Sequence, residues 1–246
     1  PSLTTRVLDL VNSIFFGSKD SERISGVEEA SIFLGLNRIR DLIAATPVIE
    51  EIFKLGKKSS SFPWVDFWKH SIGTAMLTRE ILSFAEEEFE QEADYVAGLL
   101  HNLGILILAI TFPDHFSEVY KKDYKSYLEL LETEKEIIGW DHAKIGAYYL
   151  WNHHISEEVV DSIHWHNQPS EAKASPKLAS AIQIADHIVR QLGTCGMENY
   201  PVNSEDDYMK LDGWTILFGD NPEAESVKSQ LKSSLERLEQ TLNGVI

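Results

Sequence analysis

Residues 97–104 read AGLLHNLG and place His101 in a segment that is apolar on nearly every side, with a glycine three residues later. The same pairing, a histidine followed by a glycine three or four residues on, recurs at His70 and His142. Residues at this spacing are neighbours on a helix, and a glycine there leaves room for an imidazole or for the backbone of a second helix. We therefore expect three inward-facing histidines, each on a different helix.

Helix signals recur along the whole chain, whereas strand signals are nearly absent. Apolar residues three and four apart, serine and asparagine caps, and prolines at helix starts indicate an all-α protein. We expect a helical bundle with an N-terminal helical lobe at residues 1–60, a second lobe at 64–192 and an extension at 193–246. The second lobe is predicted to contain helices at 66–85, 93–110, 141–151, 156–165 and 176–192, with a polar helical insert at 114–136.

The extension loses its periodicity between residues 193 and 207 and ends in an amphipathic helix after Pro222. The apolar stripe of this helix, from Val227 to Leu242, has a spacing close to a heptad. We expect the helix to pack back on its own core, and the alternative is a homodimer seam.

The 246-residue chain carries 39 acidic and 22 basic side chains, which gives a formal net charge of −17. This charge argues against nonspecific binding to nucleic acid or to anionic lipid. A single cysteine, Cys195, excludes an intrachain disulfide and is typical of the reducing cytosol, so we expect a cytoplasmic protein. The most apolar stretch, residues 96–112, contains His101 and Asn102 and is predicted to be a buried helix rather than a membrane span.

Periodicity also places two further polar residues among apolar neighbours. Asp186 falls between Ile182 and Val189 on one stripe, whereas its neighbour His187 shares a face with Gln183, Arg190 and Gln191. His166 follows Val159 and Ile163 on an inward face and is favoured over His164. The candidate ligands are therefore His70, His101, His142, His166 and Asp186.

Buried ionisable groups are costly unless they are paired or bound to a metal. A single buried histidine is most simply explained as a core residue that bonds a backbone carbonyl. Several such histidines together with a buried aspartate favour a divalent metal, because imidazole and carboxylate from separate helices form a usual arrangement for one. His153 and His154 lie in a predicted surface loop, and Lys69 and Lys144 face away by periodicity, so no cation is placed to hold an anionic substrate.

The chain resembles the HD superfamily of metal-dependent phosphohydrolases and, more closely, the HD-related output domain (HDOD) family of bacterial signalling proteins. The likeness covers about the first 190 residues, and Asn102 stands where the HD motif has aspartate. The matching segments are TRVLDLVNS (5–13) with FFG (15–17), residues 24–36, WKHS (68–71), AGLLHNLG (97–104), DHAKIGA (141–147) and residues 163–169.

The resemblance implies a regulatory output domain that acts through signalling partners or an upstream receiver or sensory module, and no organic cofactor. It also implies a degenerate metal pocket formed by His70, His101, Asn102, His142, His166 and Asp186. An amide oxygen is a weaker ligand than a carboxylate, so Asn102 should weaken the binding of an ion such as Fe, Ni, Zn or Mn. The alternative is a working phosphohydrolase that acts on a nucleotide or a cyclic dinucleotide.

A third hypothesis is DNA binding. Residues 27–34, a turn at Gly35 and residues 37–45 have a helix-turn-helix outline, but only Arg38 and Arg40 would face phosphate. The strongly acidic composition makes this the least favoured hypothesis. The chain begins at Pro1 and its helical pattern starts almost at once, which indicates a fragment of a longer protein.

Overall fold

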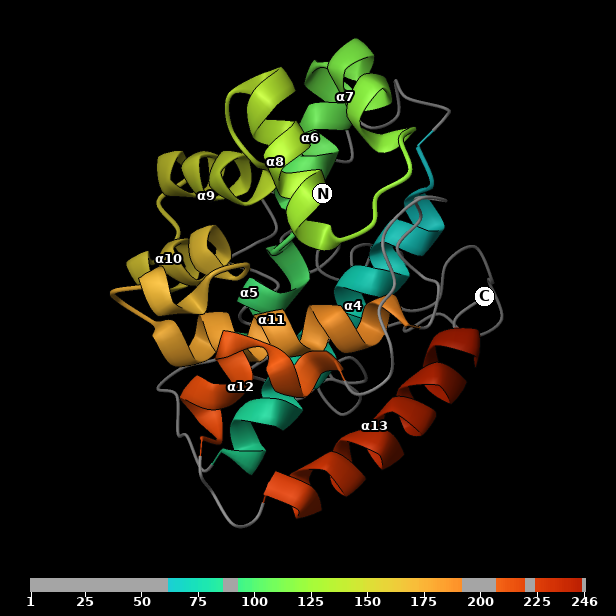
Figure 1. Cartoon of the computed structure of the whole chain (residues 1–246), viewed down its shortest axis with the longest axis vertical. Coiled ribbons are helices and arrows are strands. Elements are labelled where there is room, and N and C mark those ends of the chain that lie inside the picture. Colours follow the sequence, from blue (N-terminus) through green and yellow to red (C-terminus); the bar gives the residue numbers. More distant parts are fainter. Residues whose placement is uncertain (1–61, 86–92, 192–206, 220–223, 245–246) are drawn as a thin grey trace, which may run out of the picture.

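The computed structural model describes residues 62–85, 93–191, 207–219 and 224–244, and all the regular structure in these ranges is helical (Figure 1). The predicted all-α fold is therefore confirmed. The predicted N-terminal lobe, its helix-turn-helix outline and Cys195 lie outside the described residues. The bounds of the first seven described α-helices are α4 Trp64–Phe84, α5 Ala93–Leu100, α6 Leu103–Thr111, α7 Pro113–Tyr120, α8 Tyr127–Ile138, α9 His142–Asn152 and α10 Glu157–Trp165. They are followed by η2 Pro169–Glu171, α11 Pro176–Arg190, η3 Asp207–Lys210, α12 Asp212–Leu217 and α13 Ala224–Gly244.

The centre of the molecule is formed by α4, α5 and α11, which pack against one another (Figure 1). Gly98 permits the contact between α4 and α5, because a Cβ at this position would lie 2.6 Å from the Cα of Ala75. The helix α11 is buried along its whole length from Leu178 to Arg190. These three helices therefore hold their inward-facing polar residues at close range.

The predicted continuous helix over residues 93–110 is wrong at one point, because the chain turns at His101 and Asn102 between α5 and α6. Asn102 has φ −97° and ψ 15°, and its carbonyl accepts a hydrogen bond from the N–H of Ile105 at 3.0 Å. Asparagine is a favoured residue at a helix start. The turn directs both side chains inward, and His101 and Asn102 are 0% and 3% exposed.

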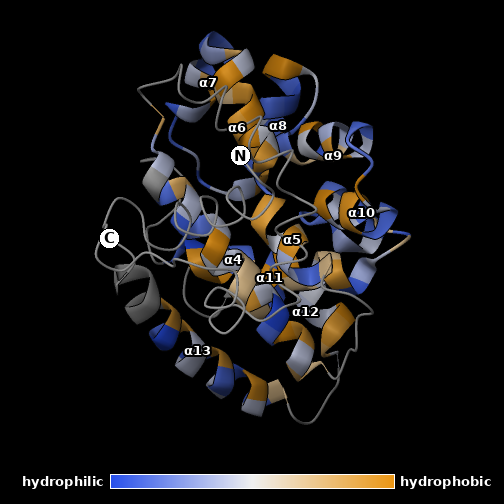
Figure 2. Ribbon diagram, turned by 180° about the vertical axis from the view of Figure 1, so that it is seen from behind, coloured by the Kyte–Doolittle hydropathy of each residue, from blue (hydrophilic) through white to orange (hydrophobic). Residues whose placement is uncertain are grey.

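The stretch 93–111 is long and apolar enough to cross a membrane, but 83% of its most apolar 18 residues are buried inside the fold. Figure 2 shows the apolar colouring of α5 and α6 within the bundle. The burial is that of a core helix, as the sequence predicted.

The helices α6 and α9 approach each other through two glycines. A Cβ at Gly104 would lie 1.8 Å from the carbonyl oxygen of His142, and a Cβ at Gly146 would lie 3.0 Å from the backbone nitrogen of Gly104. No side chain fits between these backbones, so the expectation that the glycines admit a second helix is confirmed. The close approach brings His142 alongside the start of α6.

The predicted polar helical insert at 114–136 is confirmed as helical and consists of two helices, α7 and α8. Ser126 caps α8 by accepting a hydrogen bond from the N–H of Glu129 at 3.2 Å. Gly139 ends α8 in the left-handed conformation with φ 91°. Asp141 then caps α9 by accepting from the N–H of Lys144 at 2.9 Å. The two caps fix where α8 ends and where α9 begins with His142.

The helix α13 packs on its own core, as predicted. Its residues Val227, Leu231 and Leu238 are 4% exposed or less, and Figure 2 shows its alternating polar and apolar colouring. Glu80 of α4 accepts hydrogen bonds from Ser234 at 2.5 Å and from Arg237 at 2.7 Å. The sequence interpretation missed η3 and α12, which precede α13.

Candidate metal centre

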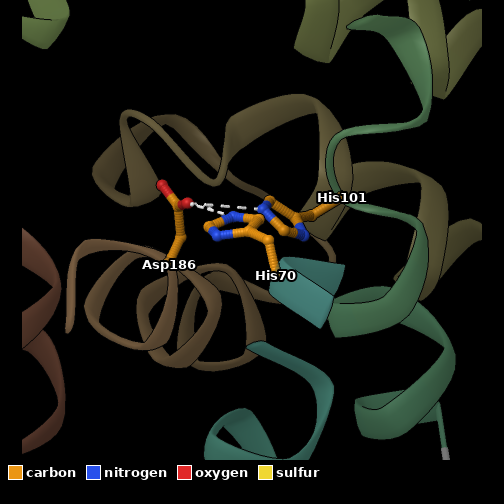
Figure 3. A group of neighbouring side chains, drawn as sticks. All are labelled: His70, His101 and Asp186. Carbon is orange, nitrogen blue, oxygen red and sulfur yellow. Dashed lines mark hydrogen bonds and ion pairs between the residues drawn. The ribbon is translucent and has the colours of Figure 1, made fainter. Parts of the chain in front are cut away.

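His70 of α4, His101 at the end of α5 and Asp186 of α11 bring their ligand atoms within 4.8 Å of one another (Figure 3). The distance from Asp186 Oδ1 is 3.0 Å to His70 Nε2 and 3.4 Å to His101 Nε2. All three side chains are at least 98% buried. This cluster could hold a metal ion.

One ring nitrogen of His101, Nε2, makes no hydrogen bond in this cluster. Its Nδ1–H donates to the carbonyl oxygen of Gly98 at 2.7 Å, so a neutral ring carries a lone pair at Nε2. That lone pair lies 3.4 Å from a carboxylate oxygen of Asp186, and in the described part of the chain Nε2 makes no hydrogen bond. A positive charge between these two buried atoms, either a proton on Nε2 or a metal ion, would stabilise the pair.

His70 and Asn102 present a second conflict. His70 Nε2 lies 3.0 Å from Asp186 Oδ1, to which it can donate, and 3.3 Å from Asn102 Nδ2, from which it can accept. One ring nitrogen cannot do both. Burial lowers the pKa of His70, and its bond to Asp186 opposes this effect without overcoming it. A metal ion ligated by His70 Nε2 and Asp186 Oδ1 would take the place of the hydrogen bond between them, because each atom can offer a lone pair.

His166 continues the row of imidazoles. Its ring lies edge-on to His101 with centroids 5.4 Å apart, and its Nδ1–H donates to the carbonyl oxygen of Ile163 at 2.7 Å. Burial, reinforced by His101 and His142, lowers the pKa of His166 to about 3, so the ring is neutral at pH 7. Like His101, it keeps a buried Nε2 that makes no hydrogen bond within the described residues.

His142 differs from the other histidines because both ring nitrogens have side-chain partners. Nδ1 lies 2.8 Å from a carboxylate oxygen of Glu134, and Nε2 lies 3.1 Å from the hydroxyl of Tyr127. Burial acts to lower the pKa of His142, but Glu134 outweighs burial and raises it. The ring centroid of His142 lies 5.7 Å from that of His166, so all four histidines form one connected group.

Arg190 corrects a prediction. The sequence interpretation placed it on the outer face of its helix, yet it is 5% exposed and its Nη2 lies 2.8 Å from Asp186 Oδ2. Burial acts to raise the pKa of Asp186, but Arg190, His101 and His70 hold it well below the ordinary value. Gln183 and His187, also expected on the outer face, are 8% and 4% exposed. The apolar stripe of α11 did not separate buried from exposed residues, because α12, η2 and η3 also pack against this helix and bury residues outside the stripe.

Sequence reasoning missed Glu134, Tyr120 and Tyr127. Glu134 is fully buried in a helix that carries three other glutamates, and the hydroxyl of Tyr120 donates to Glu134 Oε1. A usable signal was the spacing of Glu134 from buried Leu130 and Leu131, four and three residues earlier.

The remaining predictions about individual side chains agree with the structure. His166 is fully buried while His164 is half-buried, His154 is exposed and His153 half-buried, and Lys144 points out over the ring of Trp140. Burial therefore confirms that the five candidate ligands face inward. Their role as ligands stays a prediction.

Comparison with known proteins agrees with this geometry. A family model described as the HDOD domain matches residues 1–169 of the chain. The chain belongs to the HDOD family. A relative from Treponema pallidum (strain Nichols), described only as an uncharacterized protein, is 24% identical over 194 residues. These residues make up 78% of this chain and 36% of that relative, so the HDOD chain spans about a third of its length.

Solved structures share the fold of this HDOD protein. An HDOD domain protein of unknown function from Geobacter sulfurreducens has a TM-score of 0.70 at 21% identity, covering 99% of this chain and 82% of its own. A protein from Shewanella amazonensis SB2B, provisionally named a phosphohydrolase, has a TM-score of 0.63 at 22% identity, covering 98% and 82%. A protein from Marinobacter aquaeolei VT8, provisionally named a signal transduction protein, has a TM-score of 0.64 at 22% identity, covering 99% and 53%.

Proposed function

We propose that this HDOD protein is a noncatalytic signalling domain whose buried pocket binds one divalent metal ion through His70, His101 and Asp186. The observation that carries the proposal is the buried Nε2 of His101, which lies 3.4 Å from Asp186 Oδ1 and makes no hydrogen bond among the described residues. Two imidazoles and a carboxylate suit Zn, Fe, Ni or Mn. The signalling role is supported by the family and by the name of the Marinobacter protein.

Two features favour a noncatalytic pocket. Asn102 offers an amide where the HD motif offers a carboxylate, which removes a negative charge from the ligand set. Among the described residues, Arg190 is a cation that contacts the cluster, but it is bound to Asp186 and is 5% exposed. A divalent ion could lower the pKa of a bound water, but a hydrolase must also hold the anionic substrate. A bound Arg190 cannot do so while it neutralises Asp186.

The alternative function is hydrolysis of a nucleotide or cyclic dinucleotide phosphoester. One observation favours it: a guanidinium lies beside the cluster, and released from Asp186 it would bind phosphate. Under either function the protein would act in the cytosol on signalling partners, coupled to a receiver or sensory module.

The test is the metal content of protein purified without a metal-affinity column, together with titration of the chelator-treated protein with Zn²⁺. We expect one ion per chain in wild type and tighter binding in Asn102→Asp, because a carboxylate replaces an amide. The matched control is Asn152→Asp, which makes the same chemical change on the exposed face of α9. An empty wild type that Zn²⁺ does not fill would refute the metal site.

Hydrolysis is tested separately with bis(p-nitrophenyl) phosphate and with cyclic dinucleotides, using metal-loaded wild type and Asn102→Asp. We expect no turnover by wild type above that of His70→Gln. Turnover by wild type that His70→Gln abolishes would establish the phosphohydrolase instead.

A further inference from the structure

The pocket contains more histidines than one ion requires, and they divide into two groups by their hydrogen bonds. His101 and His166 each donate Nδ1–H to a backbone carbonyl and keep a buried Nε2 without a hydrogen bond among the described residues. His142 instead has a side-chain partner on each nitrogen. In either protonation state, the Tyr127 hydroxyl occupies the nitrogen of His142 that a metal would need.

Glu134 holds His142 firmly in this orientation. One carboxylate oxygen accepts from the backbone N–H of His142 at 2.9 Å, and both oxygens lie within 2.9 Å of its Nδ1. The Tyr120 hydroxyl donates to the same carboxylate. Both Glu134 and His142 are 0% exposed, so solvent does not compete for these bonds.

The two carboxylate oxygens of Asp186 face different neighbours. Oδ1 faces His70 and His101, whereas Oδ2 lies 2.8 Å from Arg190 Nη2. The guanidinium carbon of Arg190 lies 4.1 Å from the ring centroid of Tyr127, a cation–π contact. Arg190 and Tyr127 are thus stacked, with one bound to Asp186 Oδ2 and the other to His142 Nε2.

A second ion bridged to the first by Asp186 would need Oδ2 and a further imidazole nitrogen. Arg190 holds Oδ2 and Tyr127 holds the Nε2 of His142, so among the described outer imidazoles only the Nε2 of His166 is left, and a single nitrogen does not hold an ion. We infer that Tyr127 and Arg190 close the second cation position of this pocket, so that His142 is a positioning residue and the site holds a single ion. This inference rests on the proposed metal site.

The experiment titrates chelator-treated full chain with Co²⁺ and follows calorimetric stoichiometry and the visible absorption of the bound ion. The proteins are wild type, Tyr127→Ala, Tyr127→Phe, Tyr148→Phe, His142→Gln and His70→Gln, each checked for helicity by circular dichroism. Tyr127 is half-buried, so its truncation leaves the core intact. Tyr127→Phe keeps the ring under Arg190 and removes only the hydroxyl that covers His142 Nε2. Tyr148→Phe makes the same change on an exposed residue of α9 and is the matched control.

We expect one Co²⁺ per chain in wild type and Tyr148→Phe, and a second, weaker Co²⁺ in Tyr127→Phe and Tyr127→Ala, because both of these variants uncover the Nε2 of His142 beside His166. His142→Gln should change the first dissociation constant by less than about threefold, whereas His70→Gln should raise it by at least about tenfold. Two ions in wild type, no second ion in Tyr127→Ala, or a tenfold weaker first ion in His142→Gln would each overturn the inference while leaving the metal site standing. No binding by wild type would overturn both.

Discussion

Gly104 and His142 touch through their backbones: a Cβ at position 104 would lie 1.8 Å from the carbonyl oxygen of His142. This contact joins α6 to α9 and sets the distance between the turn that carries His101 and the helix that begins with His142. The pocket therefore depends on the absence of a side chain at a residue that is not itself a candidate ligand.

Gly104→Ala should destabilise the protein strongly, because the methyl group meets backbone atoms that cannot move aside. Overpacking of this kind costs about 3 kcal/mol. Gly146→Ala should cost less, since its Cβ would meet the nearest atom at 3.0 Å. Urea unfolding of both variants measures the difference. An equal or reversed order would mean that the helices separate freely.

Glu134→Gln should cost about 3 kcal/mol of unfolding free energy, because it removes the charge from a fully buried pair with His142. Glu136→Gln makes the same change on an exposed residue of α8 and should have little effect. The measurement is urea unfolding at pH 7. A loss of the same size in both variants would place the cost in helix propensity rather than in the pair.

His166 should make the metal-free protein less stable as the pH falls. Its pKa is about 3 in the folded chain against an ordinary value of 6.5, so below pH 6.5 the unfolded chain binds a proton that the folded chain does not. Stability is then lost toward pH 3, by about 1.4 kcal/mol for each pH unit. Comparing wild type with His166→Gln between pH 7 and pH 5, in the presence of chelator, should show a loss about 2 kcal/mol larger in wild type.

His115→Gln is the control for this pH series, because His115 is exposed and its substitution should leave the wild-type pH dependence in place. Equal slopes for wild type and His166→Gln would contradict the assignment of a neutral buried imidazole.

A saturating metal ion should raise the unfolding free energy by about 2.7 kcal/mol when its concentration is a hundred times the dissociation constant. At the same metal concentration the gain should fall by about 1.4 kcal/mol or more in His70→Gln, because the loss of a ligand raises the dissociation constant at least about tenfold. It should grow in Arg190→Met, because in that variant the ion replaces the charge that neutralises Asp186. Thermal unfolding with and without Zn²⁺ tests all three proteins, and an undiminished gain in His70→Gln would place the ion elsewhere.

The helices and the three clustered ligands could be predicted because His70, His101 and Asp186 are isolated polar residues on apolar stripes. Arg190 was misplaced because α11 is covered on every side and no face of it is reserved for charge, although its spacing of four residues from Asp186 was a usable signal. Glu134 was missed for a different reason: α8 carries several charged side chains, as a solvent-exposed helix does. The break at His101 and Asn102 was missed because apolar residues continue on both sides of it.

The helix α4 carries His70 near its start, and its Glu80 is held by Ser234 and Arg237 of α13. Ten residues of helix separate these two points, which is about 15 Å. The intervening turns are packed against α5 and α11, so α4 behaves as a stiff rod. A displacement of α13 must therefore either break the hydrogen bonds to Glu80 or move α4, and with it His70. The C-terminal helix is in this way mechanically coupled to the pocket.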